Sequence, residues 1–187
     1  MLRWIISRWR GLAPIPQPAP EASEPPVPQA GAVPYRVTDK GLSLLLVTSR
    51  RTGRWVFPKG GLMSGRTPWA SAAQEALEEA GVEGEVEDVA LGVYPSVRIR
   101  GERRQPLEVT LYLLRVTRQL DRWPERGQRR RQWMSLPEAI ARLGDPGLVA
   151  VLEQATPRLE ALTPAVRSKK GSGKASAKNQ TRAEPGR

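Results

Sequence analysis

The stretch from Gly60 to Val82, GGLMSGRTPWASAAQEALEEAGV, constrains the fold most, because it joins a glycine-rich loop to one well-delimited helix. Thr67 suits the N-cap, Pro68 the first helical position and Gly81 the residue that follows the C-cap. Most residues between them are alanine, leucine and glutamate, which favour helix. The pattern therefore predicts a helix that begins at Pro68 and ends before Gly81.

The two faces of this helix differ in chemistry. At about 100° per residue, its apolar side chains fall on one side: Trp69, Ala73, Ala76, Leu77 and Ala80. Glu75, Glu78 and Glu79 fall on the other side, at the spacing of neighbours on a helix surface. Such a cluster is either a solvated acidic face or a site for a hard cation such as Mg²⁺ or Mn²⁺. Because the preceding glycines let backbone N–H groups approach phosphate oxygens, the pattern favours metal-assisted phosphate chemistry.

The chain contains no cysteine and no histidine. Disulfides, thiolate or histidine metal sites, and Ser-His-Asp or Cys-His catalysis are therefore excluded. Acid–base chemistry must come from carboxylates, lysine, tyrosine or metal-bound water. No apolar run approaches the roughly 20 residues of a membrane-spanning helix.

The net charge of +11 is concentrated at the ends of the 187-residue chain. Residues 164–187 carry +6, whereas the first 35 residues carry +1. The composition predicts three parts: a basic, proline-rich and disordered segment (1–31), one folded domain (32–161) and a basic disordered tail (162–187). The basic ends are compatible with non-specific contacts to nucleic acid or to an acidic membrane. We expect a cytoplasmic protein.

Strand and helix patterns within the domain predict an α/β fold with a mixed sheet and helices on both faces. Residues 42–48 form an apolar run typical of a strand buried on both sides. The other predicted strands are 35–37, 55–57, 86–88, 91–100, 108–116 and 129–134, with a turn at 101–102. Two further amphipathic helices are expected at 136–142 and 148–159.

The central stretch resembles the Nudix box, G-x5-E-x7-R-E-U-x-E-E-x-G-U, where U is aliphatic. Gly60, Glu75, Glu78, Glu79, Gly81 and Val82 match that pattern, and Ala76 takes the small apolar position. Two positions depart from it, because Arg66 stands where the family has glutamate and Gln74 where it has arginine. The resemblance implies a Nudix-like α/β/α sandwich that hydrolyses a diphosphate bond. It also implies that Glu78 and Glu79 hold the divalent metal, with Glu75 as a further ligand, and that the two departures reduce efficiency.

The segment LLLVTSRRTGRWVFPK, residues 44–59, resembles the lead-in of the diphosphoinositol polyphosphate phosphohydrolase branch of this family. Residues 120–133 resemble its later Leu-x-x-Trp and Gly-Arg-x-Arg-x-Trp segments. The branch implies a phosphate-rich substrate such as a diphosphoinositol polyphosphate or a dinucleoside polyphosphate. Arginine forks match phosphate geometry, and the expected substrate contacts are Arg36, Thr48, Arg50, Lys59, Gly60, Gly61, Arg129 and Arg131. Asp145 counts against an inositol substrate, because the branch often has lysine there.

We therefore expect a Mg²⁺- or Mn²⁺-dependent diphosphohydrolase in which Glu75, Glu78 and Glu79 are the catalytic and metal-binding residues. A glutamate of the box is the first candidate for the general base, and Glu102 and Glu108 are alternatives. The two departures at Arg66 and Gln74 leave a second interpretation open. In it, the domain binds a phosphate-rich ligand without turning it over and serves as a regulatory module.

Overall fold

Alternating apolar residues fill both faces of the central strands. The computed structural model describes residues 24–163. In β2 (Gly41–Thr48), Leu44 and Leu46 pack into one core, and Leu45 and Val47 pack into the other. A strand buried on both faces belongs in the middle of a layered fold, so the prediction made from this apolar run is confirmed.

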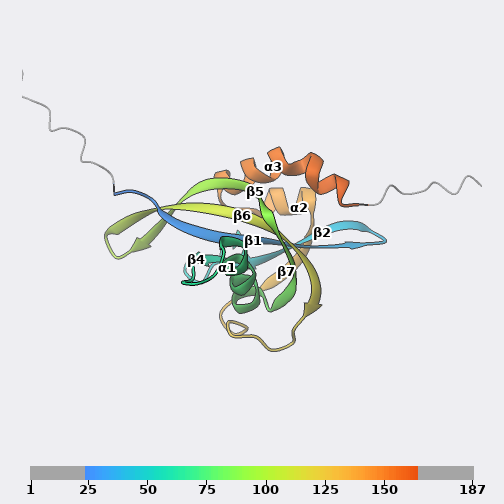
Figure 1. The fold of residues 1–187 in the computed structure, drawn as a ribbon, viewed down its shortest axis with the longest axis horizontal. Helices are drawn as coiled ribbons and strands as arrows, with labels where there is room; N and C mark the ends of the chain where they lie inside the picture. Colours follow the sequence, from blue (N-terminus) through green and yellow to red (C-terminus); the bar gives the residue numbers. More distant parts are fainter. Residues whose placement is uncertain (1–23, 164–187) are drawn as a thin grey trace, which may run out of the picture.

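The strands form one mixed sheet in the order β3-β2-β1-β6-β5 (Figure 1). β1 and β6 are parallel, and the other neighbouring pairs are antiparallel. The short strand β4 pairs with β1, and β7 pairs with β2. Their bounds are β1 Val27–Thr38, β3 Trp55–Val56, β4 Lys59–Gly61, β5 Val82–Arg100, β6 Arg103–Gln119 and β7 Arg131–Ser135.

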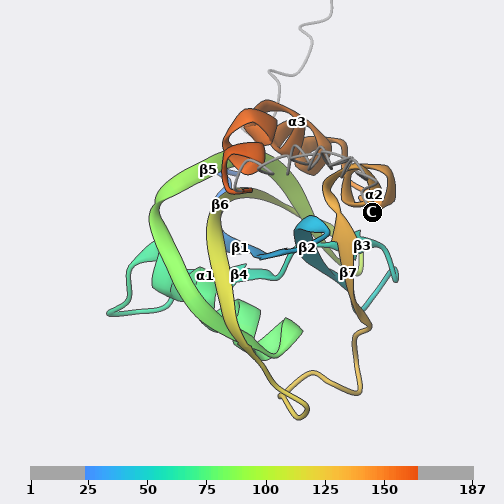
Figure 2. The ribbon, with the colours of Figure 1, turned by 90° about the vertical axis from the view of Figure 1, so that its right-hand side faces the viewer.

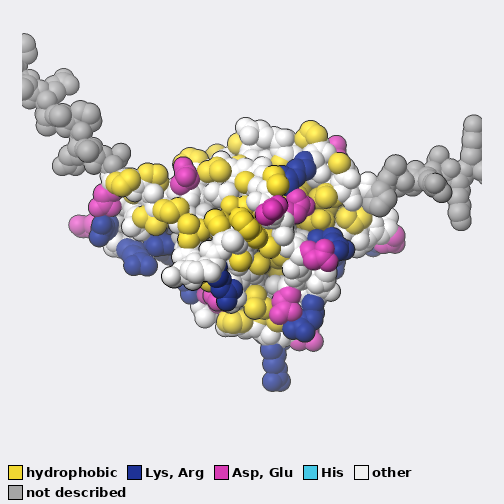
Figure 3. Space-filling model, in the orientation of Figure 1, with side chains coloured by type: hydrophobic (Ala, Val, Ile, Leu, Met, Phe, Trp, Pro, Cys, Tyr) yellow, Lys and Arg dark blue, Asp and Glu magenta, His cyan; other side chains and the backbone are white. Residues whose placement is uncertain are grey.

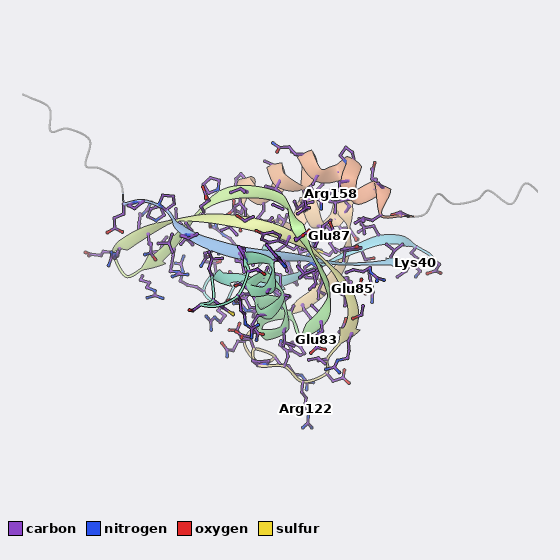
Figure 4. The ribbon with its side chains drawn as sticks, in the orientation of Figure 1. Lys40, Glu83, Glu85, Glu87, Arg122 and Arg158 are labelled. Carbon is purple, nitrogen blue, oxygen red and sulfur yellow. The ribbon has the colours of Figure 1, made fainter. Side chains whose placement is uncertain are left out.

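Helices cover both faces of this sheet. Figures 1 and 2 show α1 (Pro68–Glu75) on one face, and α2 (Leu136–Arg142) and α3 (Pro146–Ala161) on the other. α1 and the turn after it pack alanines against the smaller core, whereas α2 and α3 pack against the larger one. An ion pair between Arg158 and Glu87 also ties α3 to β5, and Figure 4 shows the two side chains together. The predicted α/β/α sandwich with a mixed sheet is confirmed.

The box helix begins as predicted but changes its hydrogen bonding in the last turn. The Thr67 hydroxyl accepts a hydrogen bond from the backbone N–H of Ala70 at 3.3 Å, and Gly81 ends the helix at a φ of 64°. The last turn, η1 (Ala76–Ala80), is a π-helix, in which the N–H of Gly81 reaches the carbonyl of Ala76. π-turns of this kind often occur at functional sites.

β1 is longer than the predicted strand at 35–37 and begins at Val27, ahead of the predicted start of the domain at residue 32. Prolines at positions 28 and 34 conceal this strand in the sequence, because proline cannot donate to a sheet ladder. Pro34 is tolerated because it falls between the residues of β1 that pair with β4 and those that pair with β2.

β5 and β6 form one long hairpin around the predicted turn at Gly101. The two strands predicted at 86–88 and 91–100 are a single strand, β5, and β6 extends past the predicted 108–116 at both ends. Register shifts in β5 at 83–84 and 86–92 interrupt the apolar alternation, which explains why the sequence pattern divides it. The hairpin carries residues 97–105 well beyond the helices (Figure 1).

The predictions for the two ends concern residues outside the described range. The predicted disorder and the predicted nucleic-acid or membrane contacts fall mainly on residues 1–23 and 164–187, so they stay predictions. Within residues 24–163, no helix is long and apolar enough to cross a membrane.

Candidate functional site

A cationic cleft opens where segments far apart in the chain meet. The turn after β2, the start of β4, the outer half of β5 and the segment before β7 surround a cavity of about 280 Å³. Five basic residues and one acidic residue line it: Arg50, Arg51, Lys59, Arg98, Arg129 and Glu79. A neighbouring cavity of about 200 Å³ shares Arg51 and Lys59 and extends to Asp145. Such a surface is suited to an anion with several phosphate groups.

Two of these arginines are absent from the sequence prediction. Arg51 belongs to the turn that supplies Arg50, and Arg98 reaches the cleft from β5. The signal that could have identified Arg98 is the concentration of arginine around the predicted turn at 101–102. However, the sequence does not show that this hairpin bends toward the box, and without that knowledge Arg98 is interpreted as an ordinary surface residue.

Glu79 is buried at the base of the cleft, where Arg129 holds it. Arg129 donates from Nη2 to the Glu79 carboxylate, from Nε to Glu125 at 2.5 Å and from Nη1 to the carbonyl of Thr48 at 2.9 Å. The other oxygen of Glu79 accepts the backbone N–H of Lys59 at 3.2 Å. The helix therefore does not present Glu79 to solvent, although its sequence pattern places it on the polar face.

Burial also changes the protonation of the glutamates. It raises the pKa of Glu79 from 4.5 to about 7, and the nearby Arg129 and the Lys59 N–H only partly oppose this. Burial, together with the negative charge of Glu78, raises the pKa of Glu75. A buried carboxyl with a pKa close to neutrality is suited to general acid–base chemistry.

Glu75 lies against the glycine that opens the box. Its carboxylate occupies the space that a Cβ at Gly60 would take. Any side chain at Gly60 would therefore displace the Glu75 carboxylate from this position. The close approach links the first glycine of the loop to the first carboxylate of the helix.

Glu78 is held by the two residues that depart from the Nudix box. Arg66 donates to Oε1 of Gln74 at 3.2 Å, and Nε2 of Gln74 donates to Oε1 of Glu78 at 2.8 Å. The expected loss of support is therefore partly offset. The hydrogen bond from Arg66 orients the Gln74 amide so that its N–H group faces the carboxylate.

Arg131 is predicted to contact the substrate, but its side chain contacts the end of the box helix instead. Its guanidinium donates to the carbonyls of Ala80 at 2.7 Å and Leu120 at 2.8 Å. It also stacks on Trp123, which lies against Gly81. Because these contacts use the guanidinium at the end of the box helix, Arg131 stabilises that helix end rather than facing the cleft.

The remaining predicted contacts divide between the cleft and other surfaces. Arg50 lines the cleft and pairs with Glu125 at 3.1 Å. Arg36 is at the far end of β1 and stacks on Trp133, away from the cleft. The Thr48 hydroxyl is buried and accepts the N–H of Arg130 at 3.0 Å, so it positions the segment before β7. Gly61 is exposed on β4.

The glutamates are the right kind of ligand for a hard divalent cation. Oxygen-only donor sets suit Mg²⁺ and Mn²⁺, and the negative charge of Glu125 acts on both Glu75 and Glu79. Among residues 24–163, however, no three acidic side chains converge closely enough to enclose an ion. A cation would have to compete with Arg129 for Glu79. The other general-base candidates, Glu102 and Glu108, are exposed and lie outside the residues that line the cleft.

The raised pKa of Glu79 predicts a pH-dependent stability for the metal-free protein. Because its pKa is higher in the folded chain than in the unfolded one, the stability it contributes is full below about pH 4.5 and is lost as pH rises through about 7. The free energy of unfolding should therefore fall by about 3 kcal/mol as Glu79 ionises. Urea unfolding in EDTA between pH 5 and pH 8 measures it, with Glu79→Gln as the variant that lacks this titration. Parallel stability curves for the two proteins would contradict the expectation.

Comparisons with known proteins agree with this fold. A family model of the NUDIX domain matches residues 25–155. Nudix hydrolase 12, mitochondrial, of Arabidopsis thaliana is 34% identical over 128 residues, which cover 59% of this chain and 63% of that protein. Diphosphoinositol polyphosphate phosphohydrolase 3-beta of Homo sapiens is 32% identical over 114 residues, which cover 60% of this chain and 66% of that protein. The chain thus spans less than two thirds of the length of these relatives.

A solved structure has the same architecture. The crystal structure of a C. elegans Ap4A hydrolase binary complex matches with a TM-score of 0.55 at 21% identity, and covers 72% of this chain and 98% of that chain. This likeness concerns the fold alone. Because the family model covers most of the chain, and the fold and the relatives agree with it, the chain belongs to the Nudix family.

Proposed function

We propose that the chain is a metal-dependent hydrolase that cleaves a diphosphate linkage in a phosphate-rich substrate. The observation that carries the proposal is the position of Glu79. It lies in a cleft with five basic side chains, at the end of a helix that carries two further carboxylates. Phosphoryl transfer depends mostly on positioning and on electrostatic stabilisation, and this arrangement offers both.

Glu75, Glu78 and Glu79 do not enclose an ion as they stand, and they would have to move closer together to hold a divalent cation, Mg²⁺ or Mn²⁺, which would polarise the diphosphate and lower the pKa of an attacking water. The residues of the chain have complementary roles. Arg50, Arg51 and Arg98 bind phosphate oxygens and offset the negative charge that develops in the transition state. Gly60 allows Glu75 to approach the loop, and Arg129 and the backbone N–H of Lys59 fix the position of the Glu79 carboxylate.

The lining of the cleft favours a substrate recognised by its phosphates. Phe57 in the cleft is fully buried, and Tyr94 in the neighbouring cavity is 2% exposed, so neither offers an open ring on which a base could stack. Diphosphoinositol polyphosphates are therefore favoured over dinucleoside polyphosphates, and the human relative is named for that class. Asp145 does not oppose this choice strongly, because one of its oxygens accepts the N–H of Gly147 at the start of α3.

The substrate class is tested by ranking kcat/KM. Purified full-length protein with Mg²⁺ or Mn²⁺ is assayed against diphosphoinositol polyphosphates, dinucleoside polyphosphates, nucleoside diphosphate sugars and capped RNA. We expect the diphosphoinositol polyphosphates to rank first and EDTA to abolish turnover. A nucleoside diphosphate sugar or capped RNA ranking first would contradict the proposed substrate class.

The contact chain from Arg66 through Gln74 to Glu78 makes a separate prediction. In Arg66→Glu, the new carboxylate would attract the Gln74 N–H group and turn the amide oxygen toward Glu78. We expect kcat to fall about 10- to 100-fold, as for other groups that orient metal ligands. Gln74→Arg should also lose activity, because it places two arginines together. The double variant restores opposite charges and should recover most of the lost rate.

Arg66→Gln is the matched control for this prediction. It keeps an N–H donor for the Gln74 oxygen and should retain activity close to that of the unaltered protein. Steady-state kinetics at several Mg²⁺ concentrations separate an effect on metal binding from a loss of fold. A double variant no more active than the poorer single variant would contradict the proposed positioning role.

A further inference from the structure

The end of the β5–β6 hairpin carries its guanidinium groups on one face. In the sheet register, Arg98 lies opposite Gln105, and Arg100 lies opposite Arg103. Because paired and alternate residues of a hairpin share a face, these four side chains point to the same side. They line a recess of about 80 Å³. Arg104 lies opposite Ile99, on the other face.

This recess adjoins the candidate active site. Arg98 lines both the recess and the main cleft. A ligand bound in the cleft can therefore extend along the hairpin without leaving arginine contacts. Figure 3 shows basic side chains gathered at the same end of the molecule as the hairpin in Figure 1.

Repulsion between these arginines lowers the stability of the folded protein unless a bound anion offsets it. Like charges directly opposite each other in a sheet are destabilising, and Arg100 faces Arg103. Arg103 pairs with Glu24 at 3.0 Å, but both side chains are more than half exposed, and such pairs contribute little. Among residues 24–163, Arg100 has no ion-pair partner within 4.0 Å. A phosphate group would offset the repulsion and match the guanidinium geometry.

We propose that Arg98, Arg100 and Arg103 form a second phosphate-binding site that continues the active-site cleft. The site takes phosphate groups of the substrate that lie outside the diphosphate to be cut. This inference rests on the proposed function and adds a specificity determinant to it. It selects compact small molecules with several phosphates over those with a single diphosphate.

The test compares two pairs of substitutions that remove the same charge. Arg100→Gln with Arg103→Gln removes two of the three arginines of the proposed site. Arg104→Gln with Arg122→Gln is the control, because Arg104 lies on the other hairpin face and Arg122 projects away from the body of the protein (Figure 4). Equal melting temperatures for all proteins show that the fold is retained.

Isothermal titration with two probes, inositol hexakisphosphate and inorganic pyrophosphate, gives the readout. The Arg100/Arg103 variant should bind inositol hexakisphosphate about 10-fold more weakly, as expected for the loss of two exposed charge contacts. Its pyrophosphate affinity should be unchanged, and the control variant should bind both probes like the unaltered protein. The inference is overturned if the control weakens inositol hexakisphosphate equally, or if pyrophosphate binding falls by the same factor.

Binding does not require turnover, so this test fails or succeeds separately from the proposed function. If the unaltered protein hydrolyses its substrate but the two variants bind both probes equally well, the second site is rejected and the proposed hydrolase activity still stands. In kinetic assays, the same site predicts that the Arg100/Arg103 variant has a higher KM for a diphosphoinositol polyphosphate and an unchanged kcat.

Discussion

Replacing Glu79 with glutamine is expected to lower kcat by about 100- to 10,000-fold, the range for the loss of a positioned acid–base group. Glutamine has nearly the same shape but can neither ionise nor accept a proton as a carboxylate does. Glu79 is the acidic residue that lines the main cleft, and it is one of the three carboxylates proposed to hold the cation. Steady-state kinetics on the best substrate measure the effect.

The variant should remain folded, because Arg129 keeps its bonds to Glu125 and to the Thr48 carbonyl. Glu83→Gln is the matched control. Glu83 pairs with Arg118 on the surface and is not among the residues that line the cleft, so its loss should leave kcat unchanged. Equal activity of Glu79→Gln and Glu83→Gln would exclude Glu79 from the reaction.

Replacing Arg129 with methionine is expected to lower the free energy of unfolding by about 3 to 5 kcal/mol, the cost of leaving a buried charge without its partner. The Arg129 and Glu79 side chains are 7% and 10% exposed, and that of Glu125 is 17% exposed. Methionine fills much of the volume but cannot pair with either carboxylate. Urea unfolding at pH 8, where Glu79 is ionised, gives the value.

Two further variants isolate the cause. Arg122→Met removes an exposed arginine and should change stability by less than about 0.5 kcal/mol. Adding Glu79→Gln to Arg129→Met should recover part of the loss, because one unpaired carboxylate is then gone. If Arg129→Met and Arg122→Met unfold with the same free energy, the buried network does not stabilise the fold.

The box helix and the sandwich could be predicted because they depend on local signals. Thr67 and Gly81 mark the ends of the helix, and the continuous apolar run Leu44–Val47 marks a strand buried on both faces. β1 could not be bounded in the same way, since Pro28 and Pro34 argue against a strand. They are accommodated because both pair only with β6 and fall outside the residues of β1 that pair with β4 and β2.

The site was harder to predict, because its contacts join residues distant in sequence. The helix pattern alone predicts that Glu79 is exposed. In the structure, Arg129, which lies 50 residues later in the chain, contacts its carboxylate. The run Arg129–Arg131 predicts two equivalent arginines, yet Arg129 faces the cleft and Arg131 holds the end of the helix. Arg98 enters the cleft only through the long bend of β5. In the sequence, Arg66 and Gln74 are two departures from the Nudix box, and only the structure shows that they form a hydrogen bond with each other.

The measurement that tests the central claim most directly is the mass of the products. Full-length protein with Mg²⁺ is incubated with the substrate panel, in parallel with Glu79→Gln, and substrate binding is measured on both. The proposed function predicts that the unaltered protein converts a phosphate-rich substrate into two products by cutting between two phosphorus atoms, and that Glu79→Gln binds it without converting it. Tight binding by the unaltered protein with no product from any substrate would contradict hydrolysis and identify the domain as a ligand-binding module.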